Sequence, residues 1–268
     1  MSIFVVDQEK CKRCWACVAE CPTRIIEIKP PNPIPTLVEG GDESCISCGH
    51  CVAVCPHAAL SHRAMMAVDC PPMRKDWAPE PEYIEHYMRA RRSIRAYKDD
   101  AVERDVLAKL IDIARFAPTG SNSQTVKWLV IQDSDEVHQI AEHVIDWMRH
   151  VSEENPSATY PGRIVAAWET GVDYICRGAP HLIIAHSSRQ GPTDCVIALT
   201  YMELAAPAFG LGTCWAGFVN AATNAWPPLQ EFLGLPEGNT SHGGLLIGYP
   251  KYKYHRLPLR NEAEIIWH

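Results

Sequence analysis

Residues 11–22 read CKRCWACVAECP, a stretch in which four cysteines follow the spacing Cys-x2-Cys-x2-Cys-x3-Cys and a proline comes directly after the last one. Residues 45–56 read CISCGHCVAVCP and repeat both the spacing and the proline. In this spacing, three thiolates of a run wrap one iron–sulfur cluster while the fourth thiolate reaches a second cluster. The chain is therefore predicted to cross twice between two neighbouring 4Fe-4S clusters.

Two sets of cluster ligands follow from this spacing: Cys11, Cys14, Cys17 and Cys55 for one cluster, and Cys45, Cys48, Cys51 and Cys21 for the other. A pair of zinc sites is the alternative, but zinc ligands that come in pairs would leave the three-plus-one spacing unexplained. The other four cysteines lie in apolar or irregular sequence and are predicted to be packed thiols: Cys70, Cys176, Cys195 and Cys214.

Residues 1–62 as a whole resemble a bacterial two-cluster ferredoxin, because they contain both cysteine runs with the spacing of that family. Between the runs, residues 24–28 (RIIEI) and 34–44 (IPTLVEGGDES) are predicted to form the two strands of a hairpin. The resemblance implies a domain that carries electrons and rarely performs chemistry itself.

The composition excludes some classes of protein for this chain. With 268 residues, 47% of them apolar, the chain is long enough and apolar enough to fill a core. Its net charge of -7 repels polyphosphate, so we expect no nucleic-acid partner. The N-terminus has no signal-peptide pattern, and the apolar stretch 195–212 is interrupted by Glu203 and Pro207. We therefore expect a cytoplasmic protein that contacts no membrane and keeps its thiols reduced.

A second domain follows the cysteine-rich one. Residues 63–82 are rich in proline and lack periodicity, so they are predicted to be a linker to a domain over residues 83–268. Helices are predicted from residue 82, over 100–118 with Asp100 and Glu103 as a capping pair, and over 194–209. Strands are predicted at 126–132, 181–187 and 243–250. Helices that alternate with strands in this way predict an α+β domain with a sheet covered by helices.

Four motifs occur in this second domain: RRSIRAY (91–97), APTGSNSQ (117–124), GLGTCWAGF (210–218) and GYPKYKYHRLPLR (248–260). The third is not a dinucleotide-binding loop, because Trp215 stands where that fingerprint has its third glycine. In their order and spacing, the four motifs resemble the FMN-dependent nitroreductase family over residues 85–260.

The resemblance implies an FMN site. FMN has a dianionic phosphate at one end and a flat ring at the other, so its site needs cations, hydroxyls and backbone donors along its length. By resemblance, Arg91 and Ser93 contact the phosphate and the ribityl chain, and Arg95 approaches the pyrimidine edge of the ring. Arg256 is implied in phosphate binding, whereas Arg92 either assists or is solvated.

The resemblance also implies a homodimer, because in the family one loop lies against the flavin of the partner subunit. The matching loop here consists of Thr119, Gly120, Ser121, Asn122 and Gln124. The turn formed by Trp215, Ala216 and Gly217 is implied to bring backbone N–H groups close to flavin N5 and O4. Two departures from the family occur, at Thr125–Val126 in place of the usual Pro-Trp and at Tyr254 in place of a lysine found in some members.

Together, the two domains predict an FMN-dependent oxidoreductase that passes electrons between two 4Fe-4S clusters and FMN and reduces a small oxidised acceptor. Analogy of fold points to nitroaromatics, quinones or activated alkenes as acceptors, and ferredoxin or NAD(P)H is the expected electron donor. The alternative is an electron-transfer or redox-sensing protein that serves a protein partner and turns over no small molecule. No catalytic side chain is assigned, and the motifs of hydrolases and kinases are absent from the sequence.

Overall fold

The chain divides between Ala78 and Pro79 into two units in the computed structural model, which describes residues 2–188 and 191–268. The first unit contains the chain up to Ala78 together with Gly120–Ser123, and the second contains Pro79–Thr119 and Gln124–His268. The division falls inside the segment predicted as a linker, residues 63–82.

Short elements joined by long loops make up the described part of the first unit. Antiparallel pairs join β1 to β4 and β2 to β3, and the second pair is the predicted hairpin, with Ile26 opposite Leu37. The elements are β1 (Phe4–Val6), α1 (Ala16–Ala19), β2 (Ile26–Glu27), β3 (Thr36–Leu37), α2 (His50–Ala53), β4 (Leu60–His62) and two 3-10 turns, η1 (Ala67–Asp69) and η2 (Lys75–Trp77). A small apolar core that includes Ile3, Ile25 and Leu60 holds these elements together.

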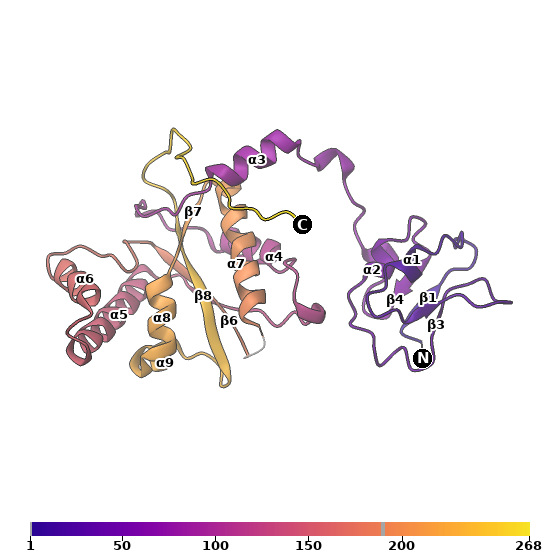
Figure 1. The fold of residues 1–268 in the computed structure, drawn as a ribbon, viewed down its shortest axis with the longest axis horizontal. Coiled ribbons are helices and arrows are strands. Elements are labelled where there is room, and N and C mark those ends of the chain that lie inside the picture. The colour runs from indigo at the N-terminus through magenta and orange to yellow at the C-terminus, as the bar shows by residue number, and fades with distance from the viewer. Residues whose placement is uncertain (1, 189–190) are drawn as a thin grey trace. The chain divides into compact units, whose positions relative to one another are not determined.

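An antiparallel sheet forms the centre of the second unit (Figure 1). Within the described residues its strand order is β5-β6-β8-β7. The strands are β5 (Lys127–Ile131), β6 (His181–Ser188), β7 (Gly212–Trp215) and β8 (Asn239–Gly248). Residues on both faces of β6 are buried, which fits the apolar run of residues 182–185 at its centre.

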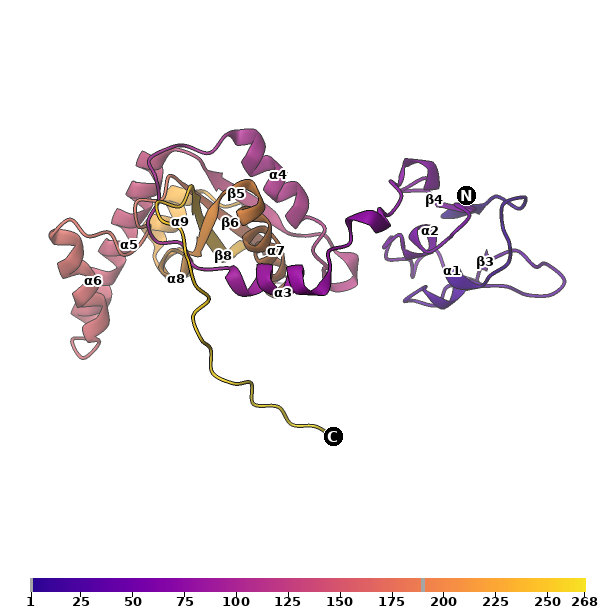
Figure 2. The same cartoon turned by 90° about the horizontal axis from the view of Figure 1, so that it is seen from above.

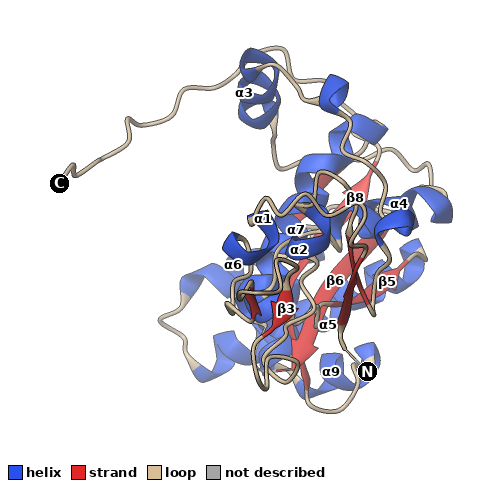
Figure 3. Cartoon of the chain, turned by 90° about the vertical axis from the view of Figure 1, so that its right-hand side faces the viewer, coloured by secondary structure: helices blue, strands red, loops and turns tan. Residues whose placement is uncertain are grey.

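Helices cover both faces of this sheet. Leu182 and Ile184 of β6 pack with α5, α8 and α9, whereas Ile183 and Ala185 face α4 and α7, because successive side chains of a strand point to opposite faces. The helices are α3 (Pro81–Ala90), α4 (Arg104–Ala114), α5 (Ser134–Glu154), α6 (Thr159–Glu169), α7 (Pro192–Ala205), α8 (Gly217–Ala225) and α9 (Pro227–Leu233), with 3-10 turns η3 (Gly120–Asn122) and η4 (Ala206–Phe209). Figure 3 colours the helices blue and the strands red, among them β5, β6 and β8 of this sheet. The predicted α+β class is confirmed.

Two further features concern the helices and the end of the chain. Among the helices of the described residues, none has both the length and the apolarity needed to cross a bilayer. After β8 the chain pairs once more, where Pro250 forms a bridge with Tyr97. Residues 251–268 then form an exposed tail that contains no helix or strand (Figure 2).

The start of α4 differs from the sequence prediction. Asp100 and Glu103 were expected to cap this helix, but the N-cap residue is Glu103 and no side chain caps the helix by a hydrogen bond. The chain is fixed just before α4 by His181 instead, because the backbone N–H of Val102 donates to His181 Nε2 at 2.7 Å. The other ring nitrogen, Nδ1, therefore carries the proton and donates to the carbonyl oxygen of Gln132 at 2.7 Å.

His181 should make the second unit less stable in mild acid. Burial lowers the pKa of this imidazole below its usual 6.5, so the unfolded chain takes up a proton first as the pH falls. The free energy of unfolding should be unaffected by this residue above pH 6.5 and should then decrease by up to about 1.4 kcal/mol per pH unit until the folded state is protonated as well. His181→Gln should remove this part of the pH dependence, as measured by denaturant unfolding at pH 7 and pH 5.

The matched control is His138→Gln, because His138 is exposed on α5 and contacts only the exposed Glu142 among charged groups of the described residues. This control should keep the slope of the unmodified protein. An unchanged slope in His181→Gln would show that another group causes the acid sensitivity.

Candidate functional site

The two cysteine runs of the first unit repeat one backbone conformation. Arg13 and Ser47 have φ angles of 57° and 51°, and Trp15 and Gly49 have φ angles of 65° and 74°. The helices α1 and α2 begin directly after Trp15 and Gly49, respectively. Left-handed residues beside right-handed ones turn successive backbone N–H groups into a concave surface, a geometry common at iron–sulfur sites. Each run therefore curls around a cavity.

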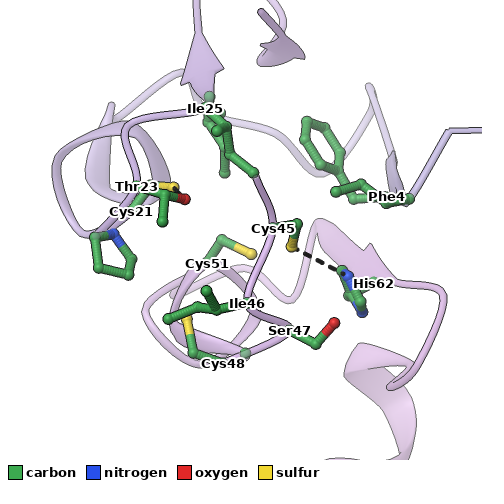
Figure 4. A pocket seen from close by; sticks show the side chains of 14 residues that line it. Phe4, Cys21, Thr23, Ile25, Cys45, Ile46, Ser47, Cys48, Cys51 and His62 are labelled. Carbon is green, nitrogen blue, oxygen red and sulfur yellow. Dashed lines mark hydrogen bonds between the residues drawn. The ribbon is translucent and has the colours of Figure 1, made fainter. Parts of the chain in front are cut away.

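Each cavity is lined by cysteines from both runs. The cavity drawn in Figure 4 has Cys45, Cys48 and Cys51 from the second run and Cys21 from the first. The other cavity is lined by Cys11, Cys14, Cys17 and Cys55. The structure therefore groups the eight thiols in the sets that the spacing predicted, although their role as ligands stays a prediction.

The walls of the two cavities differ in charge. Lys12, Arg13 and Trp15 line the cavity of Cys11, whereas Ile46, Ser47 and Gly49 occupy the matching positions of the second run. The cavity of Cys45 is thus uncharged at the two positions where the cavity of Cys11 has cations.

The chemistry of the thiols fits iron–sulfur clusters. Burial, followed by the neighbouring thiol of Cys48, raises the pKa of Cys51 to about 11, and burial also raises the pKa of Cys17. Thiolates crowded in this way are stabilised by positively charged iron, which binds only the deprotonated form. A backbone donor is already in position, since the N–H of Ala59 donates to Cys55 Sγ at 3.2 Å.

The second unit has a basic segment along the edge of its sheet. Residues 91–98 leave the end of α3 and run beside β7, where the N–H of Ile94 donates to the carbonyl oxygen of Thr213 at 2.8 Å. Ser93 and Thr213 form a parallel bridge. Gly212 permits this close approach, because a Cβ atom at this position would collide with Ile94 Cγ1 and would lie 2.9 Å from Pro250 Cγ.

A cavity of about 520 Å³ lies beside this segment. Its wall carries more positive than negative charge, with one carboxylate, Glu203, and four cations: Arg91, Arg92, Lys98 and Lys253. Four tyrosines add hydroxyl groups and aromatic surface: Tyr87, Tyr249, Tyr252 and Tyr254. Cations, hydroxyls and aromatic rings on one wall suit a ligand with an anionic group and a flat apolar part.

The two neighbouring arginines of this cavity have different partners. Arg91 Nη1 donates to Glu203 Oε1 at 2.9 Å, and Trp215 Nε1 donates to Glu203 Oε2 at 3.2 Å. Arg92 Nη1 donates to the carbonyl oxygen of Arg91, whereas Arg92 Nε is buried and has no hydrogen-bond partner within the described chain. A buried donor without a partner is costly, so Arg92 is the side chain that fits an absent anion.

Other residues expected near a flavin do not line this cavity, namely Ser93, Arg95, Trp215, Ala216 and Gly217. Arg95 is exposed and its Nη1 donates to the carbonyl oxygen of Ser93 at 3.4 Å. The turn after β7 is fixed by the N–H of Ala216, which donates to the carbonyl oxygen of Gly244 at 2.9 Å. Arg256 is exposed on the tail and lines neither this cavity nor the neighbouring one of about 480 Å³.

The loop of residues 119–124 is divided between the units. Thr119 and Gln124 belong to the second unit, and the N–H of Gln124 donates to Thr119 Oγ1 at 3.0 Å. Gly120, Ser121 and Asn122 are grouped with the first unit, where Asn122 Nδ2 lies 3.1 Å from the carbonyl oxygens of both Ile46 and Ser47. Contact of this loop with a flavin stays a prediction.

Sequence reasoning missed three charged residues of the cavity: Lys98, Lys253 and Glu203. A signal for Glu203 existed, because it lies in the mostly apolar helix α7, where an unpaired carboxylate would be costly. Lys98 and Lys253 lie within or beside quoted motifs, but their approach depends on the pairing of residues 96–98 with 249–251.

Comparison with known families and structures agrees with this architecture. The model of the nitroreductase family matches residues 88–249, and the model of the 4Fe-4S dicluster domain matches residues 10–59. The chain thus combines two separate classes of module in one polypeptide. It belongs to the nitroreductase family of oxidoreductases and has a two-cluster 4Fe-4S domain at its N-terminus.

Individual relatives are more distant. A protein of Archaeoglobus fulgidus with the provisional name NADH dehydrogenase/NAD(P)H nitroreductase is 27% identical over 161 residues, which is 60% of this chain and 82% of the relative. The FMN reductase [NAD(P)H] of Bacillus subtilis is 29% identical over 59% of this chain and 62% of its own length. A Bacteroides fragilis nitroreductase, crystallised with bound FMN, has a TM-score of 0.56 at 22% identity and covers 70% of this chain and 100% of its own. That structural likeness shows the fold.

The crossed arrangement of the cysteines can be tested by paired substitutions. Cys21→Ala with Cys45→Ala removes two ligands of one predicted set, whereas Cys45→Ala with Cys55→Ala removes one ligand of each set. After anaerobic reconstitution, iron analysis should find about four iron atoms per chain in the first variant, because one cluster keeps four thiolates, and no intact cluster in the second. Equal iron loss in both variants would contradict the crossed arrangement.

The control for these variants is Cys70→Ala, because Cys70 is exposed and lines neither thiol cavity. It should keep about eight iron atoms per chain.

The close approach at Gly212 predicts an effect on stability. Gly212→Ala should lower the free energy of unfolding by about 1–3 kcal/mol, because the added methyl group has to displace Ile94 and Pro250. Gly162→Ala is the matched control. Gly162 lies in α6, and the nearest side-chain atom to its new Cβ would be Ser152 Oγ of α5 at 3.8 Å. That substitution should stabilise the protein by about 0.5–1 kcal/mol, and both values can be measured by urea unfolding. Equal effects of the two substitutions would show that Gly212 is not needed for packing.

Proposed function

We propose that the protein is an FMN-dependent oxidoreductase in which two 4Fe-4S clusters exchange electrons with FMN and a small oxidised molecule is reduced. The observation that carries the proposal is the buried, unpaired Nε of Arg92 in a cavity with four cations. When bound, FMN would supply two-electron chemistry and the clusters one-electron transfer. FMN bound to the related Bacteroides fragilis enzyme supports the choice of flavin.

The residues of the second unit would share the binding of FMN. Arg92, Lys98 and Lys253 would hold the phosphate, because they are cations of the cavity that have no carboxylate partner within the described residues. The turn of Ala216 and Gly217 would offer backbone N–H groups to the ring, and its position is set by the hydrogen bond to Gly244. Ser93, Arg95, Trp215 and Arg256 are also proposed as FMN contacts, whereas Arg91 is proposed to contribute through its ion pair with Glu203.

The acceptor and the donor are proposed as chemical classes. Nitroaromatics, quinones and activated alkenes are acceptors that accept electrons from a reduced flavin without a strong acid or nucleophile from the protein. NADH, NADPH or a ferredoxin would supply electrons, and the names of the Archaeoglobus and Bacillus relatives support a nicotinamide donor. A homodimer is part of the proposal, because the loop of residues 119–124 would complete the flavin site of the partner subunit.

Arg92→Ala tests the proposed flavin site directly. The dissociation constant of FMN, measured by quenching of flavin fluorescence, should rise roughly ten- to a hundredfold, because a charge-assisted hydrogen bond is lost. The control Arg115→Ala should bind FMN as the unmodified protein does, since Arg115 is exposed and pairs with Asp112 on α4. No binding of FMN by the unmodified protein would reject the proposal.

Anaerobic absorbance of the reconstituted protein tests the donor and the turnover. Bleaching of the flavin band by NADPH or NADH would make nicotinamide the donor, whereas bleaching only by reduced ferredoxin would make the cluster domain the entrance. Added p-benzoquinone or nitrobenzene should then restore the band over repeated cycles. Reduction without reoxidation by either acceptor would favour an electron-transfer or redox-sensing protein instead.

A further inference from the structure

We infer that Glu203 is a positioning residue that fixes both ends of the flavin site, through Arg91 at the anion end and through Trp215 at the turn after β7. The inference rests on the proposed function and extends it to a residue outside the four motifs. Glu203 does not have to touch the flavin for this role, because it acts through side chains of two other elements.

The burial of Glu203 shows that its carboxylate has a specific task. The side chain is 7% exposed and projects from α7, a mostly apolar helix with one other acidic residue, Asp194. A buried carboxylate is tolerated only where it is paired and hydrogen-bonded. Both carboxylate oxygens meet this condition, since Oε1 accepts from Arg91 and Oε2 accepts from Trp215.

The contact with Arg91 also determines how Arg92 is presented. Tyr87 Oη donates to the carbonyl oxygen of Leu204 at 2.6 Å, so two adjacent residues of α7 hold the end of α3. The carbonyl oxygen of Arg91 in turn accepts from Arg92 Nη1 at 2.6 Å. Glu203 therefore fixes the backbone carbonyl group to which Arg92 Nη1 donates, while Arg92 Nε has no partner among the described residues.

The contact with Trp215 holds the end of β7, from which the turn proposed to contact the flavin ring begins. The indole also packs against Gly243 of β8, where a Cβ atom would lie 2.9 Å from Trp215 Cζ3 and 2.8 Å from Leu199 Cδ1. Gly243 has a φ of 149°, in the range that favours glycine. Packing against Gly243 and the hydrogen bond to the carboxylate together hold the indole in place, and the turn at Ala216 and Gly217 follows directly after it.

The charge of Glu203 also affects recognition of an anion. A free carboxylate in a phosphate site would repel the ligand, but the Arg91 ion pair makes this part of the wall neutral. The cations left for an anion are then Arg92, Lys98 and Lys253. Arg91 thus has a structural role through its ion pair with Glu203, whereas the family resemblance implies that it contacts the phosphate directly.

The first test uses the protein without flavin and observes the indole N–H of Trp215 by 1H-15N NMR. Trp215→Phe identifies the signal by removing it. Glu203→Gln should shift this signal and speed its hydrogen exchange at least tenfold, because a neutral amide is a weaker acceptor than a carboxylate. The exposed Glu231→Gln on α9 is the control and should leave the signal unchanged. An unchanged Trp215 signal in Glu203→Gln would overturn the inference.

The second test measures the dissociation constant of FMN for the same variants. Glu203→Gln should weaken binding at least tenfold, and the double variant Arg91→Gln with Glu203→Gln should weaken it less than the product of the two single effects, because a Gln–Gln pair can restore a neutral contact. A change below twofold in Glu203→Gln, or multiplicative effects in the double variant, would overturn the inference. If the unmodified protein binds FMN, such a result rejects the role of Glu203 alone and leaves the proposed function standing.

Discussion

The close approach of residues 91–98 to the edge strand β7 is the constraint on which the second unit's site depends. The backbone bond from Ile94 to Thr213 brings the arginines to the sheet, and the missing side chain at Gly212 makes the short distance possible. A second pair of contacts, between residues 96–98 and 249–251, brings Lys253 to the same cavity. Cations from two distant parts of the chain therefore share one wall because backbones pair, and not because their side chains attract one another.

The two units differ in the size of the apolar cores that stabilise them. The second unit has two apolar cores, one on each face of its sheet. The first unit has short strands, one-turn helices and one small core in its described part, and each of its cysteine runs contains left-handed residues, at Arg13 and Trp15 and at Ser47 and Gly49. Small domains with so little core need covalent or metal cross-links, so iron–sulfur clusters would be structural as well as functional components of this unit.

The spacing of residues along the sequence predicted more of the site in the first unit than of the site in the second unit. The grouping of eight cysteines in two sets could be predicted, because ligand spacing within a run is a short-range property of the chain. The α+β class could also be predicted, since apolar segments of helical and strand length alternate in the sequence. The pairing of Arg91 with Glu203 could not, because it joins residues 112 positions apart and depends on how α3 meets α7. The difference between Arg92 and Arg91 could not be predicted for the same reason. Only the folded structure shows that Arg91 pairs with Glu203 and that Arg92 Nε is buried without a partner among the described residues.

The repeated backbone of the cysteine runs has a consequence for the direction of electron flow. One conformation is used twice, yet Lys12 and Arg13 line one cavity where Ile46 and Ser47 line the other. Reduction adds negative charge to a cluster, and neighbouring cations stabilise that charge, so net charge is one of the factors that set a cluster's reduction potential. With clusters bound, charge alone would therefore favour an added electron in the cavity of Lys12 and Arg13 over the cavity of Ile46 and Ser47, although both cavities are built on one repeated loop.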